Sequence, residues 1–207
     1  MIITKSEQPV DKSAAGALVS WRSPRPSHAG GEPRVLGIDP GTRLMGVAVL
    51  EGDDLLYYAV KELRRMRPAF QLKRATGEVI RDLIERFRPD VIAYEKTFYV
   101  QQASSHLLVD QEHEIGRLGM AAGLRVAGYS PLYVRQQLCA DAYVTKQMVA
   151  RVLIQRFPEL ARYRTNQTVR SERYWLNMFD ALAVAVVAAW ELKRESANAD
   201  GHDAQAA

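Results

Sequence analysis

Three acidic residues lie in or next to apolar runs, where a carboxylate is more typical of a functional site than of a solvated surface. Asp39 follows the apolar run 35–38 (VLGI), Glu95 follows the apolar run 91–94 (VIAY), and Asp180 lies within NMFDALAVAVVAAW. A charge in such surroundings costs on the order of several kcal/mol unless it is paired or bound to metal. Oxygen ligands without cysteine or clustered histidine select a hard cation such as Mg²⁺ or Mn²⁺. Such a site suits phosphodiester hydrolysis, in which one ion activates water and a second holds the leaving oxygen.

Each acid also has a structural interpretation that involves no metal. Asp39 precedes Pro40-Gly41-Thr42, so its carboxylate could cap that turn through backbone amides. Asp180 could form a salt bridge with one of the many arginines of the chain. The apolar neighbours of Asp180 favour the functional interpretation, because strongly perturbed acids concentrate at functional sites.

The elements that must position these acids follow from the hydrophobic pattern. Two apolar runs around Pro40-Gly41 indicate a β-hairpin, and a helix between two strands favours a crossover to a parallel neighbour. We expect strands at 35–38, 45–50, 55–63, 91–94 and 125–129, and helices at 68–87, 104–122, 145–157 and 171–193. The predicted fold class is α/β, with a mixed five-stranded sheet whose first three strands are antiparallel and whose later strands are parallel, with flanking helices. Asp39 and Glu95 would then share the carboxyl edge of the sheet, where sites form in open α/β sheets.

Composition limits the class of protein. A chain of 207 residues with a net charge of +4 is expected to form one domain, and its charge permits a nucleic-acid partner without requiring one. The single cysteine, Cys139, excludes an internal disulfide and a cysteine-rich zinc site, and it suits a reducing cytoplasm. No apolar run reaches membrane-spanning length, and the N-terminus is too polar for a signal peptide. We therefore expect a soluble cytoplasmic protein with no membrane partner.

The two ends of the chain differ in composition from the middle. Residues 1–33 are rich in Ser, Pro, Gly and charge and are predicted to be a flexible arm, whereas 194–207 are predicted to be a disordered tail. Residues 34–193 form the predicted domain. The stretch 161–175 (ARYRTNQTVRSERYW) is predicted to be a loop whose arginines and tyrosines face a nucleic-acid backbone, with a plain solvated loop as the alternative.

The motifs GIDPGTRLMGVAVL, AYEKTF and FDALAVA, in this order and spacing, resemble the RuvC-type Holliday-junction resolvases. These crossover junction endodeoxyribonucleases have the RNase H-like fold, and the resemblance extends over about residues 35–192. It implies a homodimer that depends on Mg²⁺, with Mn²⁺ as a substitute, and cuts four-way DNA symmetrically in recombination and repair. It also implies a branch-migration helicase as a partner.

The resemblance assigns roles to individual residues of this chain. Asp39, Glu95 and Asp180 fall on the metal-binding carboxylates of the family. Phe98 matches the aromatic residue that stacks on junction bases, with ordinary core packing as the alternative. Arg135 and Lys146 fall where basic residues lie near the scissile phosphate, and helix N-terminal amides would assist Lys146 there. The resemblance therefore implies both a catalytic and a DNA-binding role for Lys146.

One position departs from the family pattern. The family places an acid or histidine one helical turn before its last aspartate, whereas this chain has Asn177. Its neutral carbonyl could still hold a metal, more weakly, and cannot act as a base. Glu112, His113 and Glu114 on the second helix are candidates for the missing ligand.

This departure leaves three functions open. They are an active junction nuclease, a junction-binding module that cuts weakly, and a related nuclease acting on RNA or other branched DNA. The DPGT motif also resembles the phosphate loop of actin-like sugar kinases, but 207 residues are too few for the second full domain of that fold.

Overall fold

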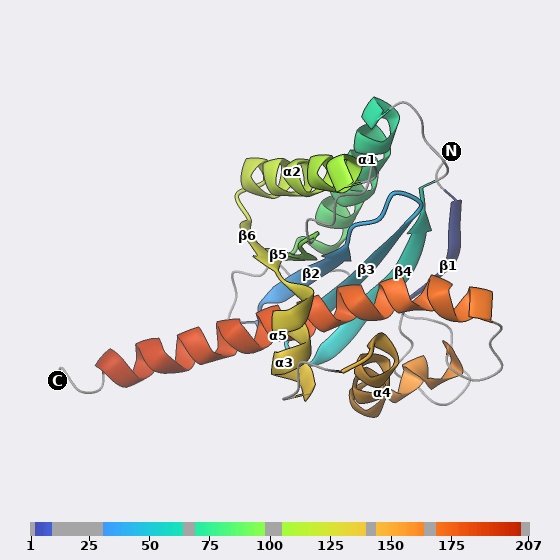
Figure 1. The fold of residues 1–207 in the computed structure, drawn as a ribbon. Helices are drawn as coiled ribbons and strands as arrows, with labels where there is room; N and C mark the ends of the chain where they lie inside the picture. The colour runs from blue at the N-terminus through green and yellow to red at the C-terminus, as the bar shows by residue number, and fades with distance from the viewer. Residues whose placement is uncertain are drawn as a thin grey trace.

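The fold is a mixed β-sheet with helices on both faces (Figure 1). The computed structural model describes residues 3–9, 31–63, 69–97, 105–139, 144–163 and 169–203. Six strands pair in the order β1-β4-β3-β2-β5-β6. Their bounds are β1 Ile3–Pro9, β2 Arg34–Asp39, β3 Leu44–Glu51, β4 Asp54–Glu62, β5 Val91–Glu95 and β6 Arg125–Tyr129.

The pairing confirms the topology expected from the sequence. Strands β2, β3 and β4 form an antiparallel meander, while β5 lies parallel to β2 and β6 parallel to β5. Asp39 pairs with Gly46 across the β2–β3 hairpin, and Glu95 pairs with Tyr129 of β6. The five predicted strands are therefore β2 to β6.

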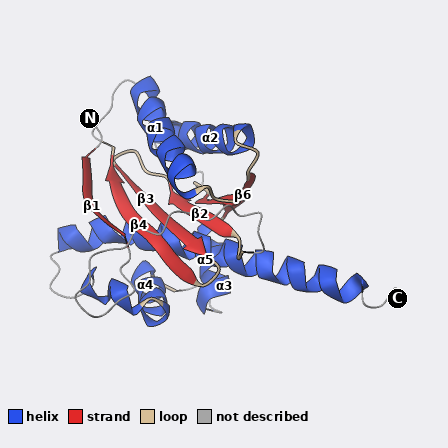
Figure 2. Cartoon of the chain, turned by 180° about the vertical axis from the view of Figure 1, so that it is seen from behind, coloured by secondary structure: helices blue, strands red, loops and turns tan. Residues whose placement is uncertain are grey.

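The helices divide between the two faces of the sheet, as Figures 1 and 2 show. Alternation along each strand directs one set of apolar side chains to each face. Helices α1 (Ala69–Phe87) and α2 (Ser105–Ala121) cover one face. The other face is covered by α3 (Pro131–Cys139), α4 (Lys146–Arg156), the 3-10 helix η1 (Pro158–Tyr163) and α5 (Val169–Asp203).

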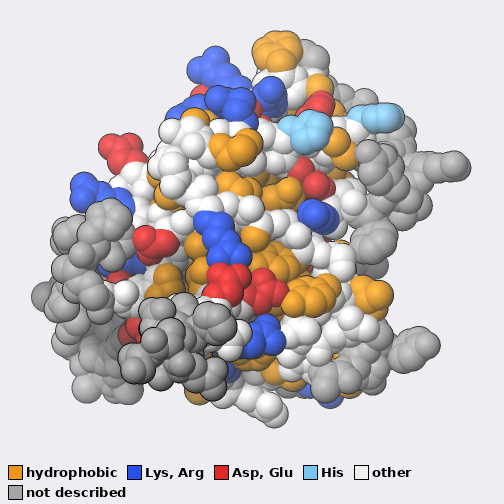
Figure 3. All heavy atoms as spheres, turned by 90° about the vertical axis from the view of Figure 1, so that its left-hand side faces the viewer, with side chains coloured by type: hydrophobic (Ala, Val, Ile, Leu, Met, Phe, Trp, Pro, Cys, Tyr) orange, Lys and Arg blue, Asp and Glu red, His pale blue; other side chains and the backbone are white. Residues whose placement is uncertain are grey.

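Both ends of the chain carry more structure than predicted. Residues 3–9, placed in the flexible arm, form strand β1, which pairs with β4 because β4 would otherwise be an open edge of the sheet. Helix α5 continues to Asp203 through the predicted tail, which is rich in alanine. An ion pair between Arg125 of β6 and Glu195, with Nη2 and Oε1 2.8 Å apart, lies along this extension. On this side of the molecule, basic and acidic side chains are interspersed (Figure 3).

Two further expectations fail on the face covered by α5. Helix α3 was not predicted, because its nine residues carry a weak apolar period. The stretch 161–175 is not simply a loop: η1 ends at Tyr163 and α5 begins at Val169, while residues 164–168 lie outside the described residues. The rings of Tyr163 and Trp175 lie 4.2 Å apart, and the Tyr174 hydroxyl donates to the Val60 carbonyl at 3.3 Å. These aromatic residues therefore pack onto the domain, and a contact of this stretch with a nucleic-acid backbone stays a prediction.

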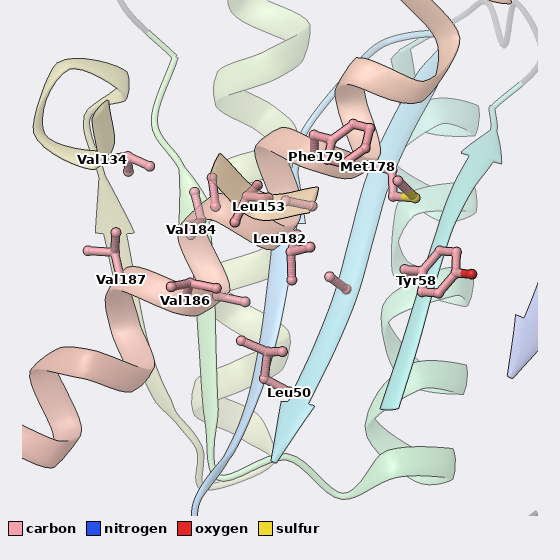
Figure 4. Packing of buried hydrophobic residues seen from close by; sticks show 14 of the residues in the cluster. Leu50, Tyr58, Val134, Leu153, Met178, Phe179, Leu182, Val184, Val186 and Val187 are labelled. Atoms are coloured by element: carbon pink, nitrogen blue, oxygen red, sulfur yellow. The ribbon is translucent and has the colours of Figure 1, made fainter. Parts of the chain in front are cut away.

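Helix α5 is the centre of one hydrophobic core. Its segment 174–198 is long and apolar enough to cross a membrane, which corrects the expectation that no run reaches that length. Two thirds of the most apolar window is buried, because the helix lies across the sheet and under α4. Figure 4 shows Leu182 and Val186 of α5 among side chains of neighbouring elements such as Leu50 and Leu153. A helix that is apolar on all sides is expected in such a buried position.

Candidate active site

Strand geometry places the first two acids together. Asp39 is the last residue of β2 and Glu95 the last of β5, and these strands are parallel neighbours. Val35 and Val91 belong to the core beneath α5, so alternation directs Asp39 and Glu95, each four residues later, to that same face. Asp39 is 9% exposed. The sequence prediction that both acids share one edge of the sheet is confirmed.

Glycines allow α5 to bring the third acid to this edge. A Cβ on Gly46 would lie 1.8 Å from the Asn177 carbonyl oxygen, and a Cβ on Gly37 would lie 2.2 Å from the Ala181 carbonyl oxygen. Only glycine therefore permits the observed approach of α5 to β2 and β3. Asp180 lies on α5 between these two contacts, at Asn177 and Ala181, and is 6% exposed. Sequence analysis missed both glycines, although glycine inside a strand is a known signal of close backbone approach.

Each of these carboxylates ionises in a buried, mostly acidic environment. Burial raises the pKa of Asp39 well above its usual value, and the charges of Asp180 and Glu95 raise it further. Burial and the charge of Asp180 together raise the pKa of Glu95 to about 7. Burial also raises the pKa of Asp180, although the neighbouring Lys146 opposes the shift. Mutual repulsion between buried carboxylates creates a strong demand for a cation.

Two basic residues lie beside the acids, as predicted. Lys146 begins α4, which Thr145 caps by accepting a hydrogen bond from the Met148 amide at 3.3 Å. The Lys146 ammonium forms an ion pair with Asp180. Burial alone would lower the pKa of Lys146, but Asp180 and the two other acids raise it. The alternative that Asp180 is salt-bridged is thus realised, with a lysine in place of an arginine.

Arg135 lies in α3, the helix that the sequence did not predict. Its charge lowers the pKa of both Glu95 and Asp180 in opposition to burial, which places the guanidinium near these two carboxylates. Arg135 of α3 and Lys146 of α4 thus both supply positive charge that acts on these acids.

The remaining predicted site residues have different outcomes. The Asn177 side chain donates from Nδ2 to the Tyr174 carbonyl at 3.2 Å, and its role as a ligand stays a prediction. Phe98 lies outside the described residues. Glu114 pairs with Arg117 at 2.6 Å, and His113 is exposed.

The candidates for a substitute ligand are thus engaged elsewhere. Glu114 is bound on the α1 side of the sheet, and Glu112 accepts a hydrogen bond from the Thr97 amide at 2.6 Å. Neither is directed at the acids as the structure stands.

The donor set fits a divalent cation in type and charge. The oxygen donors are the carboxylates of Asp39 on β2, Glu95 on β5 and Asp180 on α5, and burial raises the pKa of each. Carboxylate oxygens are the ligands that hard divalent cations prefer. Among the described residues, however, no three side chains of the His, Cys, Asp and Glu types are gathered closely enough to form a finished metal site. The Lys146 ammonium supplies part of the positive charge in this arrangement.

Comparison with known proteins supports the same interpretation. The family model for crossover junction endodeoxyribonuclease RuvC matches residues 35–188. The crossover junction endodeoxyribonuclease RuvC of Geobacter sulfurreducens is 30% identical over 161 residues, which are 74% of this chain and 90% of the relative. The protein of the same name from Moorella thermoacetica is 32% identical over 125 residues, covering 58% of this chain and 74% of the relative.

Solved structures agree on the fold. Thermus thermophilus RuvC superposes with a TM-score of 0.64 at 23% identity, covering 78% of this chain and 96% of that protein. The same protein in complex with a Holliday junction substrate gives a TM-score of 0.63 at 23% identity, covering 79% of this chain and 96% of that protein. The matched region contains both strands and the helix that carry the three acids, and we conclude that this chain belongs to the crossover junction endodeoxyribonuclease RuvC family.

Proposed function

We propose that this protein is a divalent-metal-dependent endonuclease that hydrolyses phosphodiesters at four-way DNA junctions during recombination and repair. One observation carries the proposal. Asp39, Glu95 and Asp180 come from three separate elements, are crowded together in a buried place, and have two basic side chains beside them. Membership in the crossover junction endodeoxyribonuclease family supports four-way DNA junctions as the substrate.

The residues of the site divide the work as follows. Asp39, Glu95 and Asp180 would hold the metal, with Asn177 as a neutral fourth donor. A bound divalent ion supplies Lewis acidity and an activated water for attack on phosphorus. Lys146 binds a phosphate oxygen, helped by the amides of the first turn of α4. Arg135 balances the phosphate charge from the side of α3.

The proposal extends to the ion, the partners and the location. Carboxylate and amide oxygens without a soft donor favour Mg²⁺, with Mn²⁺ as a substitute. Four-way DNA has two-fold symmetry, so paired cuts require two equivalent sites and hence a homodimer. A branch-migration helicase is the expected partner, Phe98 the expected stacking residue, and the cytoplasm the expected location.

One feature favours a second candidate function. Asn177 adds no charge at the position of an acid or histidine in related proteins, which weakens the hold on an ion. A protein of this kind would bind junctions and cut them slowly. The two functions differ in the ratio of cleavage to binding, which can be measured on one preparation.

The test compares Mg²⁺-dependent nicking of four-way, forked and linear DNA with gel-shift affinity for the same molecules. We expect cleavage of the four-way junction above all others. Asp39→Asn should reduce cleavage roughly a thousandfold or more, equivalent to about 4 kcal/mol of barrier, and leave junction binding intact or stronger.

The control is Asp82→Asn, the same chemical change at an exposed position of α1. It should cut like the wild type. Undiminished cutting by Asp39→Asn would remove Asp39 from the site, and cleavage of RNA or forked DNA in preference to four-way DNA would change the proposed substrate.

A further inference from the structure

Strand pairing does not fix the position of Asp39 relative to Glu95. The parallel pairing of β2 with β5 ends at Ile38 and Tyr94, one residue before each acid. Each acid is anchored to a different neighbour, Asp39 to β3 and Glu95 to β6. Contacts beyond the end of this pairing therefore help to hold the two segments that follow these strands.

Helix α2 makes one such contact through a buried amide. Gln111 is fully buried, and its Nε2 donates to the Gly41 carbonyl at 3.3 Å and to the Thr76 hydroxyl oxygen at 2.8 Å. Gly41 lies two residues beyond Asp39 in the hairpin turn. A Cβ at Gly41 would lie 1.9 Å from the Leu44 carbonyl oxygen, so this turn is tight and moves as a unit. Gln111 thus attaches the Asp39 turn to both helices of that face.

The next residue of α2 makes the matching contact. Glu112 accepts a hydrogen bond from the Thr97 amide at 2.6 Å, two residues beyond Glu95. The amide before it, that of Lys96, donates to the Tyr129 carbonyl at 2.7 Å. Charge-assisted bonds of this length are roughly twice as strong as neutral ones. Two consecutive residues of one helix therefore hold the segments that follow the two acids.

We propose that Gln111 and Glu112 are positioning residues that set the separation of Asp39 and Glu95 and thereby the affinity of the site for its divalent ion. The inference rests on the proposed function above. Alternation directs Asp39 and Glu95 to the face covered by α5, whereas α2 covers the opposite face. Gln111 and Glu112 act from behind the sheet and touch neither the ion nor the phosphate.

The cost of keeping Gln111 supports this role. Within the described part of the chain, its Oε1 is buried with no hydrogen-bond partner. An unsatisfied buried acceptor costs about 1–3 kcal/mol, a cost that an apolar side chain of the same shape would avoid. Helix α2 does not need the amide for its attachment, because Ile115 and Leu118 already anchor it in the core. The two bonds made by Nε2 are what the glutamine contributes.

The affinity of a metal site depends strongly on the separation of its ligands. Ligand distances must fall within about 0.2 Å of their ideal values. Small shifts of the two segments that follow Asp39 and Glu95 therefore change how tightly an ion is held.

The experiment measures metal affinity directly and without DNA. Mn²⁺ binding is followed by the electron paramagnetic resonance signal of the free ion for wild type, Glu112→Ala, Glu112→Gln and Gln111→Met. Glu112→Ala and Gln111→Met should bind Mn²⁺ about tenfold more weakly, a loss of about 1.4 kcal/mol. Glu112→Gln should bind like the wild type, since its amide oxygen still accepts from the Thr97 amide. Mg²⁺ titrations of junction cleavage should shift to higher concentration in the same order, with junction affinity unchanged.

Asp110→Ala, an exposed change on the same helix, is the matched control and should leave Mn²⁺ affinity unaltered. Equal Mn²⁺ affinity in all variants, with or without a change in thermal stability, overturns the inference. So does equal weakening by Glu112→Ala and Glu112→Gln, because that result assigns the effect to charge and not to position. If Gln111→Met does not fold, the two Glu112 variants decide the question. A wild type that binds Mn²⁺ but cuts no junction refutes the proposed function. The Mn²⁺ affinities of the variants still decide whether Gln111 and Glu112 position the acids.

Discussion

At the scale of single residues, the site is a balance of buried charges. Asp39 and Asp180 are almost inaccessible to water, and Lys146 supplies only one positive charge against three carboxylates. Burial raises the pKa of all three acids and so favours protons on them, and the neighbouring carboxylates raise the pKa of Asp39 and Glu95 further. A divalent ion must displace these protons, so metal binding and pH are linked.

The first prediction is a fall in the stability of metal-free protein as the pH rises. Glu95 has a pKa of about 7 in the fold, compared with 4.5 for the ordinary side chain. Between these values the folded state retains a proton that the unfolded state has lost, so the free energy of unfolding decreases with pH. The loss from this residue is on the order of 3 kcal/mol and is complete about one unit above pH 7. Urea unfolding between pH 5 and 8 in the presence of a chelator measures it.

Two controls make this prediction specific. Glu95→Gln, which cannot titrate, should flatten most of the dependence. Millimolar Mg²⁺ should restore stability at pH 8 and have a smaller effect at pH 5, where Glu95 is protonated. A wild-type stability that rises between pH 5 and 7 would contradict the raised pKa.

The second prediction concerns Asn177. Asn177→Asp adds an ionised ligand beside Asp180 and should raise cleavage at low Mg²⁺, with a smaller effect in Mn²⁺, which binds such sites more tightly. The variant also loses the donation from Nδ2 to the Tyr174 carbonyl and adds repulsion, so its metal-free form should unfold at a lower temperature. Cleavage rates across a Mg²⁺ titration on one junction provide the measurement. Identical titrations for both proteins would exclude Asn177 from the site.

Sequence reasoning found the acids and missed the residues that position them. Asp39, Glu95 and Asp180 were recognisable because a carboxylate within an apolar run is conspicuous. Gln111 and Glu112 carry no such signal, since a polar residue on an amphipathic helix is ordinary. Their partners, Gly41 and Thr97, lie 70 and 15 positions away in the chain and become neighbours only in the folded structure.

At the scale of elements, α5 determines both the core and the site. It packs across β2 and β3 at a distance that only Gly37 and Gly46 allow, and the alanines of 181–189 present small side chains to the sheet. The strands and this helix were predictable from period and apolarity. Strand β1 and helix α3 were not, because β1 is a run of polar residues without alternation that pairs with β4, and α3 is short and weakly amphipathic.

The third prediction tests the contact between α5 and β3. Gly46→Ala places a methyl group against the Asn177 carbonyl, so the helix must shift and carry Asp180 with it. Overpacking of this kind costs about 3 kcal/mol and should lower the melting temperature by roughly 6–12 °C. Cleavage should fall further than stability alone explains. Gly31→Ala, where a Cβ meets no atom within 4 Å, is the control and should change neither quantity. Thermal unfolding and cleavage on the same samples decide it.

At the scale of the whole molecule, the fourth prediction is a homodimer. The two glycines of helix α2, Gly116 and Gly119, lie in different surroundings. A Cβ on Gly119 would lie 2.5 Å from Val126, so this glycine faces its own sheet, whereas Gly116 faces open space and Met120 is 69% exposed. We expect light scattering to give twice the chain mass of 23.3 kDa at micromolar concentration, and Met120→Glu to lower it. A wild type that stays monomeric with and without junction DNA would contradict the proposed paired cuts.

The position of α5 in the chain has a consequence for synthesis in the cell. Asp39 leaves the ribosome roughly 140 residues before Asp180, an interval of about ten seconds or more at ordinary elongation rates. Until α5 emerges, the core on one face of the sheet lacks its central helix and the site lacks its third acid. A ribosome that stalls before this helix therefore releases a fragment that is exposed to proteases and carries an incomplete set of ligands. The order of elements along the chain thus delays completion of the site until α5 has been made.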